Sequence, residues 1–281
     1  MRRIIPIYSW YNIFMHEEKA REVIADIARK LGEDFDGVGP HFYTDGWTGA
    51  IVFDLAEKYL VKITNSETIE TQAEFLKHNP DGVFQNVRCF DYDYGYICFD
   101  FIKGEKYADK PLKAHDVIRQ VAKIVENFRE YPHDGYGFLH HEFKTWREFL
   151  ADEVEYARGC IPAISTEKVY KALEAIGDAA PKQYLLHGDF GAHNFLVDDG
   201  KIRVIDPMPA VGDFLYDFYF AILSDTDIFT KVGREFIYSF FERDESEKEA
   251  LLKIALYVRM SRAFKYDIEN FDAYLKMYEE V

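Results

Sequence analysis

Cysteine is scarce in this chain, which has three among 281 residues. Cys89, Cys98 and Cys160 form no C-x-x-C pair, and their surroundings are apolar. A sparse, odd count of this kind predicts reduced thiols in a cytoplasm rather than a disulfide framework. The nine histidines show no spacing typical of zinc ligands, so the sequence does not predict a zinc site.

Long hydrophobic runs and an excess of basic charge are also lacking. No apolar run approaches the length of a membrane span, and the start M-R-R-I-I-P-I-Y-S-W-Y is too short and interrupted for a secretory signal. The net charge of −16 argues against nucleic acid or an anionic membrane as the main partner. Such a charge suits a cationic small substrate, although acidic surfaces also serve solubility. Nothing in the sequence indicates an oligomeric state.

The composition is that of a packed protein, with 48% hydrophobic and 17% aromatic residues. We therefore expect an α+β protein with two lobes, a small antiparallel-sheet lobe over residues 1–102 and a larger, mostly helical lobe over 103–281. The periodicity predicts helices over 16–31 and 66–78 and strands over 38–44, 50–55, 59–64, 83–90 and 95–101 in the first lobe. In the second it predicts a loop over 131–141 and helices over 114–129, 145–157, 169–176, 214–223, 229–241, 247–264 and 271–278.

The second lobe is organised around the run from Leu186 to Asp217, which reads L-H-G-D-F-G-A-H-N-F-L-V-D-D-G-K-I-R-V-I-D-P-M-P-A-V-G-D-F-L-Y-D. Two apolar runs, Phe195 to Val197 and Ile202 to Ile205, flank the turn Asp198-Asp199-Gly200-Lys201. Because Asp and Gly tolerate turn conformations and the flanks are strand formers, this pattern predicts a β-hairpin.

Folding the hairpin brings together the polar residues at its open end. Asn194 precedes the first strand and Asp206 follows the second, so the two are expected side by side, with Asp189 just upstream. Two carboxylates and an amide make a hard-oxygen site for Mg²⁺, with one carboxylate left to act as a base.

The first lobe offers candidate nucleotide contacts. Gly46 and Gly49 lie in the turn between the first two strands, where backbone N–H groups could approach phosphate oxygens, although most such turns are only turns. Lys62 is the only charge in the strand Y-L-V-K-I-T. It either extends outward to water from an edge strand or reaches inward to the α- and β-phosphates of ATP.

Two further features complete these candidates. Glu70 and Glu74 lie one turn apart on the following helix, and either could orient Lys62 through an ion pair; we favour Glu70 for its distance from the helix end. The connector after the last strand could meet an adenine edge, with Asp100 offering its carbonyl and Ile102 its amide. In the second lobe, Asp152, Glu153 and Glu155 are expected to face outward, either as a solvated surface, which we favour, or as a wall that attracts a cationic ligand.

The central run resembles the aminoglycoside phosphotransferase family, which has the protein-kinase-like fold. The resemblance rests on H-G-D-x-x-x-x-N at His187 to Asn194, I-D at Ile205-Asp206 and G-D-x-x-x-D at Gly212 to Asp217. The hairpin block, together with G-Y-G and T-W-R-E-F-L between Gly135 and Leu150, looks similar to the hygromycin B phosphotransferase branch. Over the first lobe the sequence is only consistent with the family, and Trp47 is bulky for a phosphate loop.

The resemblance implies a role for each matching residue. Asp189 would be the catalytic base or hydroxyl-orienting carboxylate, Asn194 and Asp206 would hold Mg²⁺, and Lys62 would contact the ATP phosphates. His187 would brace the loop. Two more carboxylates would cap and tether the helix behind it, Asp213 and Asp217.

Several functions are compatible with this pattern. We expect an ATP- and Mg²⁺-dependent phosphotransferase whose acceptor is a hydroxyl of an aminoglycoside-like or other cationic small molecule. A kinase for choline, homoserine, a sugar or a macrolide would use the same machinery, and a non-catalytic nucleotide-binding relative would keep only the site. A protein kinase is disfavoured, because no A-P-E-type segment follows Asp206.

Overall fold

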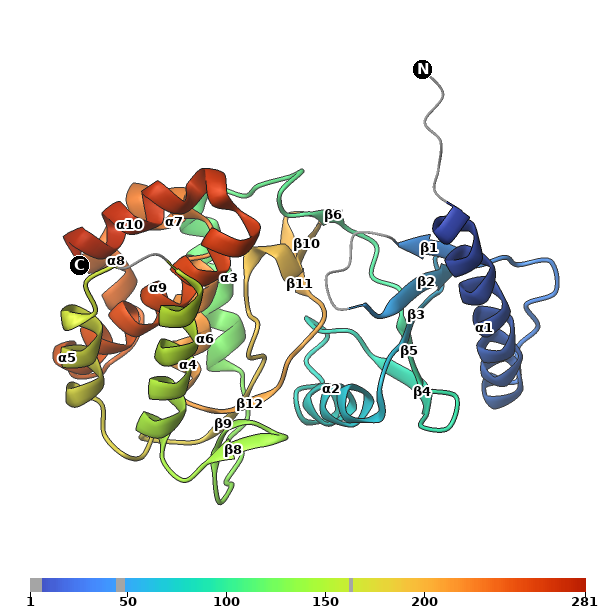
Figure 1. The fold of residues 1–281 in the computed structure, drawn as a ribbon, viewed down its shortest axis with the longest axis horizontal. Coiled ribbons are helices and arrows are strands. Elements are labelled where there is room, and N and C mark those ends of the chain that lie inside the picture. Colours follow the sequence, from blue (N-terminus) through green and yellow to red (C-terminus); the bar gives the residue numbers. More distant parts are fainter. Residues whose placement is uncertain (1–6, 44–48, 162–163) are drawn as a thin grey trace. The chain divides into compact units, whose positions relative to one another are not determined.

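The structure is a computed structural model that describes residues 7–43, 49–161 and 164–281. The chain divides into two compact units (Figure 1). The first contains residues 1–77 and 85–103, and the second contains residues 78–84 and 104–281. The chain leaves the first unit after residue 77 and returns to it at residue 85, so the short segment 78–84 belongs to the second unit.

The first unit is built on a five-stranded antiparallel sheet of order β1-β2-β3-β5-β4, which confirms the predicted sheet. Its strands are shorter than the expected ranges by one to four residues. They span His41–Tyr43 (β1), Ile51–Leu55 (β2), Tyr59–Ile63 (β3), Val87–Asp91 (β4) and Tyr96–Asp100 (β5). The strand predicted from residue 83 begins later because Phe84 forms a parallel bridge with Val204, and the Val83 carbonyl accepts from the Val204 N–H at 3.0 Å.

Two helices accompany this sheet. Helix α1 spans Ile7–Leu31 and therefore begins well before the predicted residue 16, and α2 spans Ser66–His78 as expected. Ala20, Val23 and Ile27 are spaced for one helical face and are fully buried against strand residues including Phe53. The apolar stripe of α1 thus closes one face of the sheet (Figure 1).

The second unit is mostly helical. Its longest helix, α9, spans Glu245–Tyr266 and packs against α4, α5, α6 and α10. Helix α6, Phe214–Ile222, has every residue from 215 to 222 buried. The other helices are α3 (Ala114–Glu126), α4 (Trp146–Cys160), α5 (Glu167–Ala175), α7 (Thr226–Val232), α8 (Arg234–Tyr238), α10 (Phe271–Glu280) and the 3₁₀ turns η1 (Ala192–Asn194) and η2 (Ile268–Asn270).

Two small sheets in this unit carry the central run. The predicted hairpin is confirmed: β10, Phe195–Asp198, pairs with β11, Lys201–Val204, and β6, Glu105–Lys106, adds a third strand. Asp199 and Gly200 have φ of 46° and 73°, as the tight turn requires. The other sheet has the order β8-β7-β12-β9, with β7 at Tyr136–Phe138, β8 at His141–Phe143, β9 at Tyr184–Leu186 and β12 at Ala210–Gly212.

Two predicted elements are wrong. The segment 131–141 was expected to be a loop, but it contains β7 and leads directly into β8. These strands are three residues long, and Gly137 has a φ of 94°, so no alternating pattern marks them. The helix predicted over 229–241 is two helices, α7 and α8, because Gly233 has a φ of 84°, outside the helical region.

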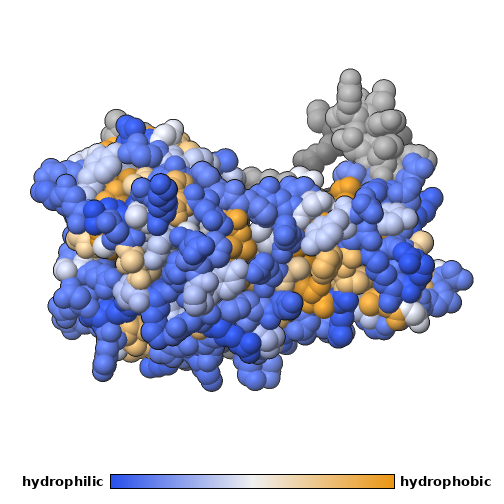
Figure 2. Space-filling view, turned by 90° about the horizontal axis from the view of Figure 1, so that it is seen from below, coloured by the Kyte–Doolittle hydropathy of each residue, from blue (hydrophilic) through white to orange (hydrophobic). Residues whose placement is uncertain are grey.

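The surface carries few hydrophobic groups on the face that is drawn (Figure 2). The face drawn in Figure 2 is mostly hydrophilic, and its hydrophobic groups form small separate patches. Within the described residues, no helix has the length and apolar character needed to cross a membrane.

Candidate active site

The residues of the central run are positioned by two adjacent strands. Strand β9 leads into His187, and β12 ends at Gly212, immediately before Asp213. The two strands are antiparallel partners, with Leu186 opposite Ala210. Because the strands are antiparallel, the H-G-D motif follows the end of β9 beside the start of β12, whereas Gly212 lies opposite Tyr184 at the other end of the pair. One strand pair thus carries both motifs, which are 25 residues apart in the chain.

Asp189 lies in the loop that follows β9, with about a third of its side chain exposed (34%). Its carboxylate accepts hydrogen bonds from His193 Nε2 at 3.0 Å and from Asn194 Nδ2 at 3.2 Å. Burial raises the pKa of Asp189, but the hydrogen bond and positive charge of His193 outweigh this and hold the pKa below its usual range. The carboxylate is therefore ionised at neutral pH and could align a hydroxyl group.

The hairpin places Asn194 next to Ile205, the residue that precedes Asp206. Phe195 is opposite Val204, and the Ile205 N–H donates to the Asn194 carbonyl at 3.1 Å. The Asn194 Nδ2 donates to Asp189, which leaves its Oδ1 as the oxygen that could bind a cation. Asp206 has a φ of 57°, a conformation that costs a non-glycine residue about 1 kcal/mol and that is typical of functional loops.

His187 joins the loop to the segments on both sides of Asp206. Its side chain is fully buried, and its Nε2–H donates to the Ile205 carbonyl at 3.0 Å. Its own carbonyl accepts from the Met208 N–H at 2.8 Å. The backbone before and after Asp206 is thereby held by one residue, as expected of a histidine that braces the loop.

This bracing predicts a pH dependence of stability. Complete burial lowers the pKa of His187 to about 4, despite the Asp189 charge and the Ile205 hydrogen bond, which raise it. Unfolded histidine has a pKa of about 6.5, so from pH 6.5 down to 4 the unfolded chain binds the extra proton and folding stability falls. We expect the free energy of unfolding of the wild type, relative to His187→Gln, to decrease by about 2–3 kcal/mol between pH 7.5 and pH 4.5.

Urea unfolding of the two proteins at both pH values measures this difference. Taking the difference removes the contributions of the other titrating groups, because His187→Gln retains them. A difference that is the same at both pH values would contradict the burial of a neutral His187.

Asp213 and Asp217 have the architectural roles that were predicted. Asp217, fully buried in α6, accepts hydrogen bonds from the backbone N–H groups of His187 at 2.6 Å and Gly188 at 3.2 Å. Asp213 caps α6 by accepting from the Leu215 N–H at 3.0 Å. The start of α6 therefore holds the loop that carries Asp189.

Three further residues of the site were not predicted from the sequence. The His193 ring lies over Gly191, where an added Cβ would come within 2.6 Å of its Cε1. Ser224, two residues after α6, accepts from the Ala192 N–H at 2.7 Å and so anchors the loop. Arg243 pairs with Asp213 at 3.2 Å. Only His193 has a sequence signal, since it directly precedes Asn194 within the motif.

The prediction that Glu153 faces outward is wrong, because its exposed fraction is only 8%. It lies one turn after Phe149 and Leu150 on the buried face of α4, and Tyr216 of α6 donates a hydrogen bond of 3.4 Å to it. Burial raises the pKa of Glu153, while the charge of Arg262 lowers it. The helical spacing should have placed Glu153 inside.

In the first unit, the structure places Lys62 in β3, between Val52 of β2 and Ile97 of β5. Strand β3 is central in the sheet, and Lys62 is 7% exposed. The alternative in which Lys62 extends to water from an edge strand is therefore wrong. Glu70 and Glu74 are exposed residues of α2, the helix that follows β3.

The remaining predicted nucleotide contacts are the glycines between β1 and β2 and the two residues at and after the end of β5. Gly46 is outside the described residues, whereas Gly49 has a φ of 70° with open space where a side chain would be. Asp100 ends β5, and its carboxylate accepts from Arg88 Nε at 2.5 Å. Ile102 follows in the connector and is 8% exposed.

Comparison with solved structures supports the kinase-like α+β fold. A choline kinase from Cryptosporidium parvum Iowa II is 14% identical, with a TM-score of 0.56 over 92% of this chain and 96% of that one. A choline/ethanolamine kinase family protein from Mesorhizobium loti is 14% identical, with a TM-score of 0.57 over 92% of each chain. The ternary complex of streptomycin, ATP and APH(2″)-IIa is 15% identical, with a TM-score of 0.52 over 92% of this chain and 96% of that one.

Sequence comparison goes beyond the fold. No curated protein matches the chain significantly. The profile of the phosphotransferase enzyme family, however, matches residues 42–257, which include Lys62 and the whole central run. Since this match covers well over half of the 281 residues, the chain belongs to the phosphotransferase enzyme family.

Proposed function

We propose that this protein is an ATP- and Mg²⁺-dependent kinase that transfers the γ-phosphoryl group to a hydroxyl of a small, cationic molecule. The observation that carries the proposal is the arrangement around Asp189. Its ionised carboxylate is held by His193 and Asn194, and the hairpin brings Asn194 to the residue that precedes Asp206. A base and two oxygen ligands at one loop are what phosphoryl transfer to a hydroxyl needs.

In this proposal Asp189 orients the acceptor hydroxyl and accepts its proton as the oxygen attacks phosphorus. The transition state of phosphoryl transfer is loose, so catalysis depends mainly on positioning and on charge neutralisation. The bonds from His193 and Asn194 fix the carboxylate in one orientation, which favours a near-attack geometry.

The oxygen donors present fit Mg²⁺. Asn194 Oδ1 and the Asp206 carboxylate are hard ligands, and Mg²⁺ commonly takes one or two such groups and fills its remaining positions with water and phosphate oxygens. Bound Mg²⁺ would neutralise charge on the nucleotide phosphates.

The nucleotide contacts are proposed from the first unit. Lys62 would contact the α- and β-phosphates, oriented by Glu70 or Glu74, and the turn with Gly46 and Gly49 would approach the phosphates. The Asp100 carbonyl and the Ile102 amide would meet the adenine. Lys62 is nine-tenths buried in a central strand, which limits the directions that its ammonium group can take.

The acceptor is proposed from charge and from related proteins. The net charge of −16 favours a cation. One similar structure contains streptomycin, and two others are choline or choline/ethanolamine kinases, whose named substrates are amines with a hydroxyl group. We favour an aminoglycoside-like acceptor, with the hygromycin B phosphotransferase branch as the nearest in motif, and a choline-like metabolite as the alternative.

A coupled ADP-release screen tests the proposal. Purified protein is given ATP and Mg²⁺ with a panel of aminoglycosides, macrolides, sugars and hydroxylated amines, and GTP is run in parallel. We expect ADP release that depends on one acceptor class, stops with EDTA and returns with Mg²⁺. The deoxy or O-methyl analogue of each active acceptor is the control, because it lacks the reacting hydroxyl. Absence of acceptor-dependent ADP release across the panel would refute the proposed acceptor class.

A further inference from the structure

Two of the three cysteines are direct partners in the sheet of the first unit. Cys89 of β4 lies opposite Cys98 of β5 in the antiparallel register. Residues directly opposite in such a pair have Cα atoms about 4.5–5.5 Å apart, within the range of about 4.4–6.8 Å that a disulfide needs. The cysteines are free thiols in this structure.

This juxtaposition depends on a local irregularity of β4. Val87 is opposite Phe99, so an unbroken register would place Arg88 opposite Cys98 and Cys89 opposite Ile97. The shift between Val87 and Cys89 instead moves Cys89 opposite Cys98. A bulge of this kind re-aims side chains, and here it brings the two thiols to the same face of the sheet.

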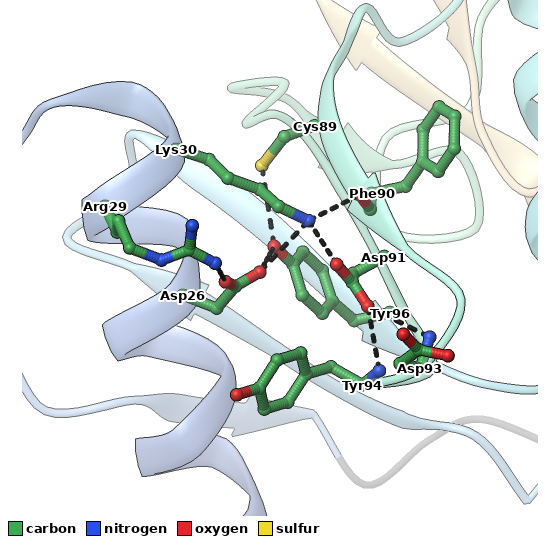
Figure 3. A network of polar contacts seen from close by, with 9 residues as sticks. All are labelled: Asp26, Arg29, Lys30, Cys89, Phe90, Asp91, Asp93, Tyr94 and Tyr96. Carbon is green, nitrogen blue, oxygen red and sulfur yellow. Dashed lines mark hydrogen bonds and ion pairs between the residues drawn. The ribbon is translucent and has the colours of Figure 1, made fainter.

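The two thiols differ in accessibility. Both pack with the core that α1 covers, but Cys98 is fully buried and Cys89 is half-buried. Figure 3 shows Cys89 beside Tyr96, whose hydroxyl lies 4.0 Å from the Cys89 Sγ and donates to Asp26 at 2.6 Å. An oxidant can therefore reach Cys89 first, with Cys98 behind it as the second thiol.

A hydrogen bond and a nearby lysine favour the thiolate of Cys89. The hydrogen bond from Cys98 lowers the pKa of Cys89, and the nearby Lys30 charge acts in the same direction, against burial and the Asp26 charge. Lys30 is held in place by Asp26 at 3.0 Å and by Asp91 at 2.6 Å (Figure 3). The proton stays on Cys98, whose pKa is raised. A thiolate beside a protonated thiol is the arrangement of a reactive cysteine and its resolving partner.

We propose that Cys89 and Cys98 are a reversible oxidation site, in which Cys89 reacts first with a hydroperoxide and Cys98 then closes an intramolecular disulfide. In the first step the Cys89 thiolate attacks the peroxide oxygen and breaks the O–O bond, which gives a sulfenic acid and, after one proton is taken up, an alcohol or water. In the second step the Cys98 sulfur attacks the Cys89 sulfur and releases water. Two equivalents of a thiol reductant restore both cysteines.

The site lies next to a proposed nucleotide contact. Cys98 is opposite Val61 of β3, and Ile97 is opposite Lys62. The disulfide would therefore tie the edge strand β4 to the strand beside Lys62. The oxidation itself does not depend on the proposed kinase activity.

Peptide mass spectrometry tests this proposal on the full-length protein. Native protein is treated with hydrogen peroxide at pH 7.5, alkylated under denaturing conditions and digested with trypsin. Cleavage after Arg88 and Lys103 releases one peptide that contains both cysteines. We expect this peptide to lose two hydrogen atoms and to take up no alkylating reagent, whereas dithiothreitol before alkylation should restore two labelled thiols.

Three variants separate the roles of the cysteines. Cys98→Ser is expected to accumulate a sulfenic acid at Cys89 that dimedone labels, and Cys89→Ser is expected to leave Cys98 reduced. Cys160→Ser is the matched control and should form the disulfide as the wild type does. The proposal is overturned if the wild-type peptide keeps both thiols while Cys160 is oxidised, or if the disulfides that form are intermolecular. Because the wild type gives the main result, the test remains decisive even if a variant fails to fold.

Discussion

Replacement of Asp189 by alanine is expected to lower kcat by about 10³-fold or more, while nucleotide affinity stays within about threefold of the wild type. The carboxylate accepts bonds from His193 and Asn194 within its own loop, and a third of its side chain is open to solvent. Its removal takes away the group proposed to align the hydroxyl, while Lys62 and the proposed metal ligands remain.

The measurement is acceptor-dependent ADP release with the most active acceptor of the screen, paired with calorimetric titration of the nucleotide. Asp199→Asn is the matched control, since it removes an exposed carboxylate from the turn of the same hairpin. Asparagine tolerates the φ of 46° at that position, so activity should be unchanged. Normal turnover in Asp189→Ala would rule out Asp189 as the base, whatever the acceptor.

The central hairpin could be predicted because its information is local. The Asp199-Gly200 turn, the flanking strand formers and the polar residues at both ends are contiguous in the sequence, and the structure has the turn with both φ values positive. The face of α1 follows the same logic, because an apolar stripe at helical spacing specifies its own burial. Patterns of this kind need no knowledge of distant partners.

The elements that could not be predicted depend on distant contacts. Strand β7 is three residues long and interrupted by Gly137, and it forms because β12, about 70 residues later, pairs with it. Ser224 and Arg243 lie outside the motif and reach the site only through the packing of the helices after Asp217. Likewise, the register shift that pairs Cys89 with Cys98 has no mark in the sequence.

Gly212 shows how two motifs that were noted separately are connected. An added Cβ at this glycine would lie 2.3 Å from the Trp146 ring, which is 2% exposed. The tryptophan of T-W-R-E-F-L therefore packs directly on the glycine of G-D-x-x-x-D. Sequence reasoning found both motifs, but only the packed structure explains why the second one needs a glycine.

Replacement of Gly188 by alanine is expected to be the most destabilising single change in the H-G-D loop. Gly188 has a φ of 78°, and an added Cβ would lie 1.9 Å from the Met208 carbonyl oxygen. This contact is with backbone, so no side-chain rotation can relieve it. The loop would have to move away from the segment after Asp206, which would break the bond from the Met208 N–H to His187 and those from His187 and Gly188 to Asp217.

Gly82 provides a control for the backbone conformation alone. It has the same φ of 78°, but nothing lies within 4 Å of the position that its Cβ would occupy. Gly82→Ala should therefore cost only about 1–2 kcal/mol for the left-handed conformation, whereas Gly188→Ala should cost at least about 4 kcal/mol and abolish ADP release. Urea unfolding of both variants gives the comparison. If their free energies of unfolding are equal, the close packing of the H-G-D loop on the segment after Asp206 is refuted, since that contact is the feature in which the two glycines differ.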